Sequence, residues 1–435
     1  MNPEKNEEKT NSKKEAVFQS VRGMHDILPK DGAAWMDMWN VGREISELHD
    51  FTFMETPILE TLGLFEAGVG KMTDIVEKEM FVFKTRGKED VALRPECTAP
   101  IMRSFLQNHL GHFASPLKVF YAGPMFRYER PQAGRYRQFH QWGFEIIGDG
   151  DPFYDAEIVL ATLHFLSALG LKELRVKINT VGCRVCRPTY QKKLLQHYKA
   201  NKKELCKDCA RRYEENPLRL LDCKAQECRE LLSGAPIILD HLCQACNAHL
   251  RQVLEFLENN MVLYEPDPHL VRGLDYYSRT VFEVVASDKP ETALAGGGRY
   301  DYLAEFLGAG RNVPGVGVSI GIERVLEYAA SKKLSIGRKD RPSIFFVVVG
   351  EEAKKKGLYL IQKLRLARVR TLESVGKKSL ENQMRAANKA KAKFVFIFGQ
   401  RECFEETIIM RNMDSGAQET IPLSRMVEEV KKRLR

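Results

Sequence analysis

The chain has 435 residues, of which 44% are hydrophobic and 29% charged, and its formal net charge is +9. This length corresponds to roughly two to four domains of about 100–200 residues each. The composition is that of a globular protein with a full core, and no stretch approaches the roughly 20 apolar residues of a membrane span. A membrane protein is therefore excluded at this level.

The first residues, 1–16, mix lysine with glutamate and contain no apolar segment. They match neither a secretory signal peptide nor a transit peptide. We therefore expect a disordered leader and a cytoplasmic location.

Residues 17–178 alternate between the apolar periods of helices and of strands. Antiparallel strands with helices packed on them indicate an α+β core. Helices are predicted over 35–51, 100–110 and 155–170, and strands over 78–96, 118–130 and 135–147.

An arginine-rich hairpin is predicted between Gly123 and Gln141, in the stretch GPMFRYERPQAGRYRQFHQ. Aromatic and charged residues alternate on both sides of the turn PQAG, so Arg127 and Arg137 would project from a sheet. The planar fork of donors on arginine suits phosphate or carboxylate ligands. The alternative is a solvated basic hairpin whose arginines form ion pairs with Glu129.

Two carboxylates stand in unusual settings. In LRPECTAP, residues Arg94, Glu96 and Thr98 alternate, so on a strand they would share one face. Glu96 could bind an ammonium group or form a surface ion pair with Arg94. Glu145 lies within the apolar strand sequence GFEII, where an unpaired carboxylate would be costly, so we expect it to have a partner.

Residues 179–262 are rich in lysine, leucine and cysteine and are mainly helical in pattern. Eight of the ten cysteines fall here in four close pairs, which in a reducing compartment favour metal coordination over disulfides. Eight thiolates suit two tetrahedral zinc sites, with one site or free thiols as the alternatives. The candidate ligands are Cys183, Cys186, Cys206, Cys209, Cys223, Cys228, Cys243 and Cys246.

Strand and helix patterns resume over 263–332. The run GGGRYD at 296–301 lacks the spacing of the common nucleotide-binding fingerprints, so it indicates either close backbone approach to a ligand or a tight turn. Arg324 falls in the first turn of a predicted helix. A cation there opposes the helix dipole and is more expected if an anionic ligand lies nearby.

A polar hinge over 333–342 precedes a small α/β domain over 343–435. Residues 338–435 carry 23 Lys and Arg against 12 Asp and Glu, whereas the preceding residues carry 44 against 46. A segregated basic domain indicates a polyanionic partner. The alternative is a surface tuned for solubility.

Six segments occur in the order found in class II aminoacyl-tRNA synthetases, and together they resemble the histidyl-tRNA synthetase family of bacterial type with a Cys-rich insertion. The segments are ETPILE, LRPECTAP, the arginine hairpin, LVRGLDYYSRTVFE, GGGRYD and VGVSIGIER. The resemblance implies a class II antiparallel-sheet catalytic domain over 17–178 and 263–332. It also implies a helical insertion over 179–262 and an anticodon-binding domain over 343–435.

The same resemblance implies ATP-dependent attachment of L-histidine to tRNA(His) through histidyl-adenylate, by a homodimer that uses ATP with Mg²⁺. The alternative is a non-catalytic, synthetase-like regulatory subunit of ATP phosphoribosyltransferase. In adenylation the attacking carboxylate is already ionised, so catalysis consists of positioning two anions and neutralising charge. Several fixed arginines suit that task.

Roles for individual residues follow from the resemblance alone. The implied catalytic residues are Arg272 and Arg127. Histidine would be bound by Glu96, Thr98, Gln141, Glu145, Tyr276 and Tyr277, the imidazole by Glu145 and Tyr277. ATP would be bound by Arg127, Tyr136, Phe139 and Arg324. The tRNA acceptor end would meet Gln132, Arg135 and Arg137, its stem would meet the insertion, and residues 55–60 would lie at the dimer interface.

Cys97 stands where the family usually has glycine. A small thiol fits such a position, and because it lies beside the implied ligand residues we expect sensitivity to thiol reagents.

Overall fold

The computed structural model describes residues 18–132, 134–334, 336, 343–374 and 379–434. The expected leader, 1–16, and most of the expected hinge, 333–342, lie outside these residues. The chain divides into two compact units between Gly337 and Arg338. Within the described part of the chain, no helix has the length and apolar character needed to cross a membrane.

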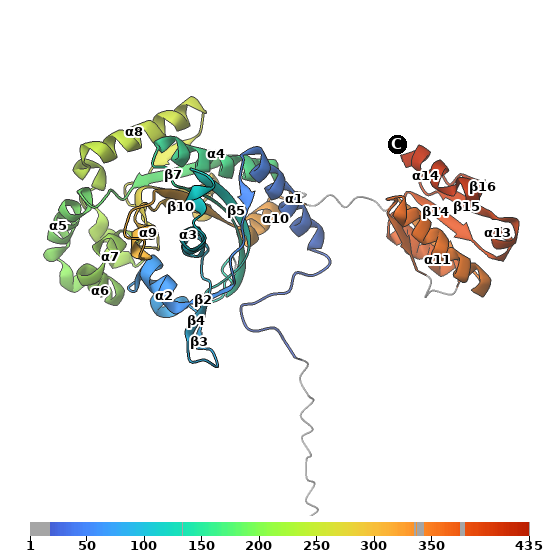
Figure 1. Cartoon of the computed structure of the whole chain (residues 1–435), viewed down its shortest axis with the longest axis horizontal. Helices are drawn as coiled ribbons and strands as arrows, with labels where there is room; N and C mark the ends of the chain where they lie inside the picture. The colour runs from blue at the N-terminus through green and yellow to red at the C-terminus, as the bar shows by residue number, and fades with distance from the viewer. Residues whose placement is uncertain (1–17, 133, 335, 337–342, 375–378, 435) are drawn as a thin grey trace, which may run out of the picture. The chain divides into compact units, whose positions relative to one another are not determined.

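An eight-stranded sheet forms the centre of the first unit (Figure 1). Its order is β1-β5-β6-β11-β10-β9-β7-β8, and neighbours are antiparallel except for the parallel pairs β1–β5 and β7–β8. The expected antiparallel α+β class is confirmed. The strands are Thr52–Phe53 (β1), Leu117–Phe126 (β5), Gln138–Ile147 (β6), Leu174–Thr180 (β7), Tyr264–Pro266 (β8), Ser278–Ala286 (β9), Lys289–Arg299 (β10) and Gly315–Gly321 (β11).

Both faces of this sheet are buried, because successive side chains on a strand point to opposite faces. On β5, Phe120 and Ala122 belong to one apolar core, whereas Val119 and Tyr121 belong to the other. The first core is completed by α1 (Gly32–Leu48), α4 (Pro152–Ala168), α8 (Gln244–Asn259) and α10 (Ile322–Ser331). The second is completed by α2 (Leu62–Phe65), α3 (Thr98–Gln107) and α9 (Leu303–Phe306).

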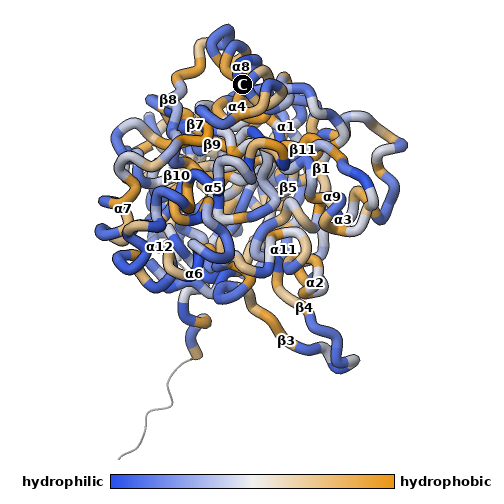
Figure 2. Tube along the Cα trace, turned by 90° about the vertical axis from the view of Figure 1, so that its left-hand side faces the viewer, coloured by the Kyte–Doolittle hydropathy of each residue, from blue (hydrophilic) through white to orange (hydrophobic). Residues whose placement is uncertain are grey.

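A small three-stranded sheet, in the order β2-β4-β3, extends from the same unit. It comprises β2 (Leu59–Thr61), β3 (Val82–Lys84) and β4 (Asp90–Leu93), and the strands predicted over 78–96 are confirmed as the antiparallel pair β3 and β4. Figure 2 shows β3 as an apolar segment of a protruding hairpin. Val82 and Phe83 are exposed there, each at 46%.

The Cys-rich insertion is mainly helical, as predicted. It comprises α5 (Cys186–Lys199), α6 (Lys207–Glu215), a 3₁₀ segment (Pro217–Asp222), α7 (Gln226–Leu232) and α8. The insertion has its own apolar core, which includes Tyr190, Leu194 and Leu220. Its last helix, α8, instead contributes Val253 and Leu257 to the core on the large sheet. The insertion is therefore joined to the part of the first unit that carries the large sheet through a shared core.

The second unit is built on a five-stranded sheet in the order β13-β12-β14-β15-β16. The first three strands are parallel and the last two antiparallel to their neighbours, which confirms the α/β expectation. Its strands are Ile344–Val348 (β12), Thr371–Glu373 (β13), Phe394–Phe398 (β14), Thr407–Asn412 (β15) and Gln418–Pro422 (β16). Its helices are Glu351–Leu366 (α11), Leu380–Lys389 (α12), Gln400–Glu405 (α13) and Met426–Leu434 (α14).

Candidate active site

Three arginines from distant segments line one cavity of about 140 Å³. Arg127 follows β5, Arg272 lies in the loop before β9, and Arg324 lies in the first turn of α10. Phe139 and Gln141 of β6 line the same cavity. The fold thus brings together the three guanidinium groups that the sequence singled out.

Two of these arginines are held by uncharged partners. Arg127 Nε donates to the Pro95 carbonyl at 2.9 Å, and its guanidinium carbon lies 5.3 Å from the centre of the Phe139 ring. Arg324 Nε donates to the Gly134 carbonyl at 3.0 Å. Carbonyl acceptors orient a guanidinium group without cancelling its charge, so the cavity keeps positive charge for an anionic ligand.

The surroundings of Arg324 show that this charge is not balanced within the cavity. Burial lowers the pKa of Arg324, and the nearby guanidinium groups of Arg135 and Arg127 lower it further. Glu129 opposes this shift, but the pKa is still lowered overall. An anion bound between these groups would relieve the repulsion.

Of Arg127, Arg272 and Arg324, Arg272 is the one with a carboxylate partner in the described structure, since its Nη1 pairs with Glu283 of β9. Burial alone would lower the pKa of Arg272, but Glu283 and the Tyr277 hydroxyl raise it. Its Nε is buried without a partner in the described structure. A buried unpaired donor is costly and is expected where a ligand completes the site.

The glycine run makes room for Arg272. Residues 296–298 lie in β10, so a tight turn is not formed there. A Cβ atom on Gly296 would come within 2.4 Å of Arg272 Nη2. Gly296 must therefore lack a side chain for the Arg272 guanidinium group to lie over the sheet.

The two predicted strands of the arginine hairpin are confirmed, but both are shorter than predicted. β5 ends at Phe126 and β6 begins at Gln138, so Arg127 and Arg137 lie just beyond the strands. Beyond the strands, the Arg127 N–H donates to the Arg137 carbonyl at 2.9 Å, and Gln132 and Arg135 form an isolated bridge. Pro131 cannot donate to a ladder, and Gly134 has φ of +73°. Both residues disrupt regular pairing.

The sequence allowed two interpretations of the hairpin arginines, binding of an anionic ligand or ion pairs on a solvated hairpin, and the structure supports each of them for different residues. Arg135 is exposed and lies 3.5 Å from a Glu129 oxygen, as the ion-pair alternative expected. The Arg137 guanidinium lies over the Tyr128 ring, 3.7 Å from its centre. Gln132 is exposed. Arg127 and Arg135 both line the cavity, but Arg127 is only partly exposed and has no carboxylate partner among the described ion pairs.

Glu145 is fully buried and has the partners that its position required. It accepts hydrogen bonds from Thr98 Oγ1 at 2.7 Å and from the Tyr300 hydroxyl at 2.6 Å. Burial raises the pKa of Glu145 to about 8, although the hydrogen bonds from the two hydroxyl groups act to lower it. A Cβ atom on Gly317 of β11 would clash with this carboxylate, so the small residue makes its space.

LRPECTAP is a turn followed by a helix, so the prediction of one shared strand face is wrong. Glu96 accepts from the backbone N–H groups of Thr98 at 2.7 Å and Ala99 at 3.0 Å, which begin α3. Helix N-termini favour carboxylates in this way. Arg94 is buried and donates to the Thr56 carbonyl at 2.7 Å, so it is not in a surface ion pair.

The remaining predicted histidine-binding residues surround these carboxylates. The Tyr276 hydroxyl donates to Glu96 Oε2 at 3.3 Å, and the rings of Tyr276 and Tyr277 have centres 4.7 Å apart. Gln141 is 8% exposed, and its buried Oε1 has no partner in the described structure. This acceptor lines the arginine cavity and is available to pair with a ligand.

Two residues of the site were not predicted from the sequence. Tyr300 donates to Glu145, and Glu283 pairs with Arg272. Tyr300 lies in GGGRYD, which the sequence interpretation treated only as a glycine run. Glu283 could have been noticed as a carboxylate inside the apolar strand TVFEVVA, by the argument that applied to Glu145.

Cys97 does not fulfil the expectation of sensitivity to thiol reagents. Its side chain is 0% exposed, and burial raises the pKa of the thiol to about 12. Reaction requires an accessible thiolate. The small thiol fits the position, where it lies 3.6 Å from Thr56 Oγ1.

Tyr136 lines the same cavity as the three arginines and donates to Glu327 Oε1 at 2.5 Å. This hydrogen bond and burial raise the pKa of Tyr136 to about 12. With Phe139, it places two aromatic rings at the cavity wall. Aromatic faces of this kind suit stacking with a purine base.

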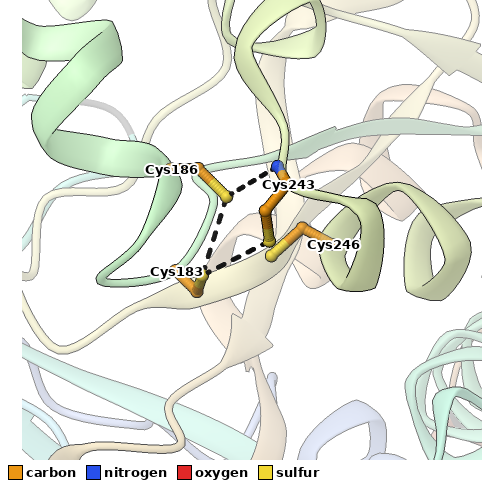
Figure 3. A group of neighbouring side chains, drawn as sticks. All are labelled: Cys183, Cys186, Cys243 and Cys246. Atoms are coloured by element: carbon orange, nitrogen blue, oxygen red, sulfur yellow. Dashed lines mark hydrogen bonds between the residues drawn. The ribbon is translucent and has the colours of Figure 1, made fainter.

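The eight clustered cysteines form two groups of four. In each group all four sulfur atoms lie within 4.8 Å of one another. The first group joins the start of α5 to the start of α8, and Figure 3 shows its side chains converging. The groups are Cys183, Cys186, Cys243 and Cys246, and Cys206, Cys209, Cys223 and Cys228.

Comparison with known proteins gives one consistent family. A family model described as histidyl-tRNA synthetase matches residues 23–325, and one described as anticodon binding domain matches residues 343–433. The histidine–tRNA ligase of Natranaerobius thermophilus is 42% identical over 417 residues, covering 95% of this chain and 99% of that protein. The crystal structure of apo S. aureus histidyl-tRNA synthetase has a TM-score of 0.81 at 33% identity, covering 95% of this chain and 100% of that one.

A structure from Bacillus halodurans, described as an ATP phosphoribosyltransferase regulatory subunit/histidyl-tRNA synthetase, has a TM-score of 0.63. It is 22% identical and covers 88% of this chain and 99% of that one, so this likeness shows the fold alone. The ligase match extends over nearly the whole chain at far higher identity. The chain belongs to the histidyl-tRNA synthetase family.

Proposed function

We propose that this protein attaches L-histidine to tRNA(His) in an ATP-dependent reaction that proceeds through histidyl-adenylate. The observation that carries the proposal is the cavity lined by Arg127, Arg272 and Arg324. Burial raises the pKa of Glu96, and this carboxylate lies close enough to Arg127 for the guanidinium charge to oppose that rise. Tyr277 lies near both Arg272 and the buried Glu145. Fixed positive charge beside a small polar pocket suits the joining of an amino acid to a nucleotide phosphate.

The arginines would act by holding two anions together. Arg127 would bind the α-phosphate, Arg324 the γ-phosphate, and Arg272 both the histidine carboxylate and the α-phosphate. Attack of that carboxylate on the α-phosphorus forms the acyl phosphate bond and releases pyrophosphate. The unpaired Arg272 Nε and the unbalanced charge around Arg324 support these assignments.

The lining of the cavity suits the phosphates of ATP bound with Mg²⁺. Glu283 and Glu323 have carboxylate oxygens, the ligand type that Mg²⁺ prefers, and would be the candidate ligands. In this structure Glu283 pairs with Arg272, and Glu323 accepts hydrogen bonds from His140. A bound Mg²⁺ would supply neutralisation of phosphate charge. Tyr136 and Phe139 would contact the adenine ring.

Histidine selection would come from the buried polar groups beside the cavity. A neutral imidazole has one donor and one acceptor, and Glu145 with Tyr277 would satisfy both. Glu96, Thr98, Gln141 and Tyr276 would bind the amino group and close the pocket. An analogue without either ring nitrogen would leave a buried polar group unpaired, which strongly disfavours its binding.

The proposal includes tRNA(His) as partner, a homodimer and a cytoplasmic location. The basic second unit would bind the anticodon end, so affinity for tRNA should fall steeply with salt, and a flat salt dependence would contradict this.

Exposed Gln132, Arg135 and the neighbouring Arg137 would meet the acceptor end. Ile58 and Leu59 are exposed apolar residues within 55–60, where the dimer interface is expected, and the exposed Phe53 precedes that segment. Sedimentation showing a monomer would contradict the dimer.

The experiment that tests the proposed function is ATP–pyrophosphate exchange with each of the twenty amino acids. We expect exchange with L-histidine alone, followed by charging of tRNA(His). The regulatory-subunit alternative predicts no exchange with any amino acid. Exchange with another amino acid would contradict the assigned specificity.

The two cysteine groups would each hold a structural Zn²⁺. Tetrahedral zinc with Zn–S bonds of about 2.3 Å places its sulfur ligands about 3.8 Å apart. The sulfur atoms of Cys183 and Cys243 are 3.8 Å apart, and so are those of Cys206 and Cys223. The soft donor set and this spacing both fit zinc.

We expect two zinc ions per chain in protein purified without chelator, measured by mass spectrometry of the metal. Cys223→Ser should reduce this to about one, because three thiolates bind zinc less tightly than four. Cys403→Ser, outside both groups, is the control and should retain two. Fully active protein with almost no zinc would contradict the assignment.

A further inference from the structure

The loop that carries Arg272 and Tyr277 has no regular secondary structure. Residues 271–277 lie between β8 and β9 and belong to no strand or helix. Strands and helices fix their side chains through repeated backbone hydrogen bonds, whereas a loop depends on contacts from its surroundings. The groups that bind the backbone of this loop therefore determine where Arg272 and Tyr277 lie.

The Cys-rich insertion binds this loop at both ends. Arg219 Nη1 donates to the Arg272 carbonyl at 3.1 Å, and Arg187 Nη2 donates to the Tyr277 carbonyl at 2.6 Å. Between these two contacts, Asn216 Nδ2 donates to Asp275 Oδ1 at 2.7 Å. All three donors come from the insertion, although the loop belongs to the catalytic part.

Arg219 is itself held in place. It is 9% exposed, and its Nη2 lies 3.2 Å from Asp74 Oδ2. The same Asp74 oxygen binds Arg212 Nη2 at 2.7 Å. A guanidinium group that bridges a carboxylate and a carbonyl in this way has little freedom to move. Arg219 thus connects Asp74, the insertion and the Arg272 backbone.

Each of the two arginines is tied to a different cysteine group. Arg187 follows Cys186 directly in α5. Arg219 lies between Cys209 and Cys223 in the sequence, and both of these cysteines belong to the second group. A metal bound to all four thiolates of a group fixes the chain segments that supply them. Metal binding would therefore restrict the motion of both arginines.

We propose that Arg187 and Arg219 are positioning residues for histidine activation, held against the 271–277 loop by the metals of the two cysteine groups. The inference rests on the proposed function, because it assigns these residues to the adenylation site. Neither arginine contacts a reactant. Their hydrogen bonds to backbone carbonyls keep Arg272 at the cavity and Tyr277 beside it.

The kinetic test is Arg219→Ala in the full chain, with Arg219→Lys as the conservative variant. We expect the kcat of histidine-dependent pyrophosphate exchange to fall at least tenfold in the alanine variant, with KM for ATP within twofold of wild type. Lysine should restore part of kcat. The matched control is Arg251→Ala, an exposed arginine on α8 of the same insertion, which should behave as wild type.

Hydrogen exchange followed by mass spectrometry gives a readout that does not depend on turnover. The peptide containing 271–277 should exchange faster in Arg219→Ala, and faster in wild-type protein stripped of metal by a chelator, than in metal-loaded wild type. Unchanged kcat and unchanged exchange in Arg219→Ala would overturn the positioning role. Unchanged exchange after metal removal would overturn the part assigned to the metals.

These outcomes are separable from failure of the proposed function. If the wild-type protein shows no histidine-dependent pyrophosphate exchange, the adenylation assignment is wrong. The hydrogen-exchange comparison then still decides whether Arg219 and the metals hold the loop.

Discussion

Replacing Arg272 by alanine is expected to lower the kcat of histidine-dependent pyrophosphate exchange by about 10²–10³-fold or more, while ATP binding is largely retained. Removal of one preorganised electrostatic group typically costs about 3–4 kcal/mol of transition-state stabilisation. Arg272 would contact both reactants, whereas Arg127 and Arg324 would remain to bind the phosphates. Initial rates at saturating ATP and histidine, with equilibrium binding of ATP, measure the two effects.

Two further variants make this result specific to Arg272. Arg311→Ala removes an exposed arginine from the same catalytic part and should leave exchange unchanged. Arg272→Lys keeps the charge but not the planar fork, so it should recover only a fraction of the rate. Exchange by Arg272→Ala within tenfold of wild type would show that this residue does not have the proposed role.

Glu145→Gln is expected to raise the KM for histidine by about 10- to 100-fold, with a much smaller effect on the KM for ATP. Glutamine has the same shape but can neither carry charge nor give a proton to the imidazole. Leaving a buried donor or acceptor without its partner costs about 1–3 kcal/mol, which corresponds roughly to this range. Steady-state exchange with each substrate varied in turn is the measurement, and equal effects on both KM values would refute the assignment.

Glu145→Gln is also expected to gain thermal stability relative to wild type as the pH rises. Burial raises the pKa of Glu145 from an ordinary value of 4.5 to about 8, so the folded state holds a proton that the unfolded state releases. Wild-type stability from this group is present below about pH 4.5 and is lost as pH rises toward 8. The Tm of Glu145→Gln relative to wild type should therefore increase between pH 5 and 8. A constant difference would contradict the raised pKa.

Most of the fold could be predicted from the sequence, because its periods are regular. The apolar runs of β5 and β6 and the stripe that buries Met426 and Val430 on α14 are strong patterns. The cysteine spacing also predicted two groups of four, since close pairs must meet other pairs to complete tetrahedral sites. In both cases the local pattern and the tertiary arrangement agree.

The arginine hairpin shows where local pattern failed. Its alternation continues through Arg137, but Pro131 and Gly134 interrupt strand pairing. Arg127 and Arg137 are instead held by the carbonyl groups of Pro95 and Arg22, respectively, and Arg137 also by the Tyr128 ring of the same hairpin. Likewise, the alternation around Glu96 gave no sign that α3 begins at Thr98. Which tyrosine reaches Glu145 depends on the registration of β10 against β11, a long-range feature that no short motif contains.

The most direct test of the account is a crystal structure with histidine and a non-hydrolysable ATP analogue. We propose that the guanidinium groups of Arg127, Arg272 and Arg324 hold the histidine carboxylate against the α-phosphate of ATP. The expected result is the α-phosphate within hydrogen-bonding distance of Arg127 and Arg272, the γ-phosphate at Arg324, and the imidazole beside Glu145. Phosphates bound elsewhere, with these three side chains turned away from them, would contradict the account.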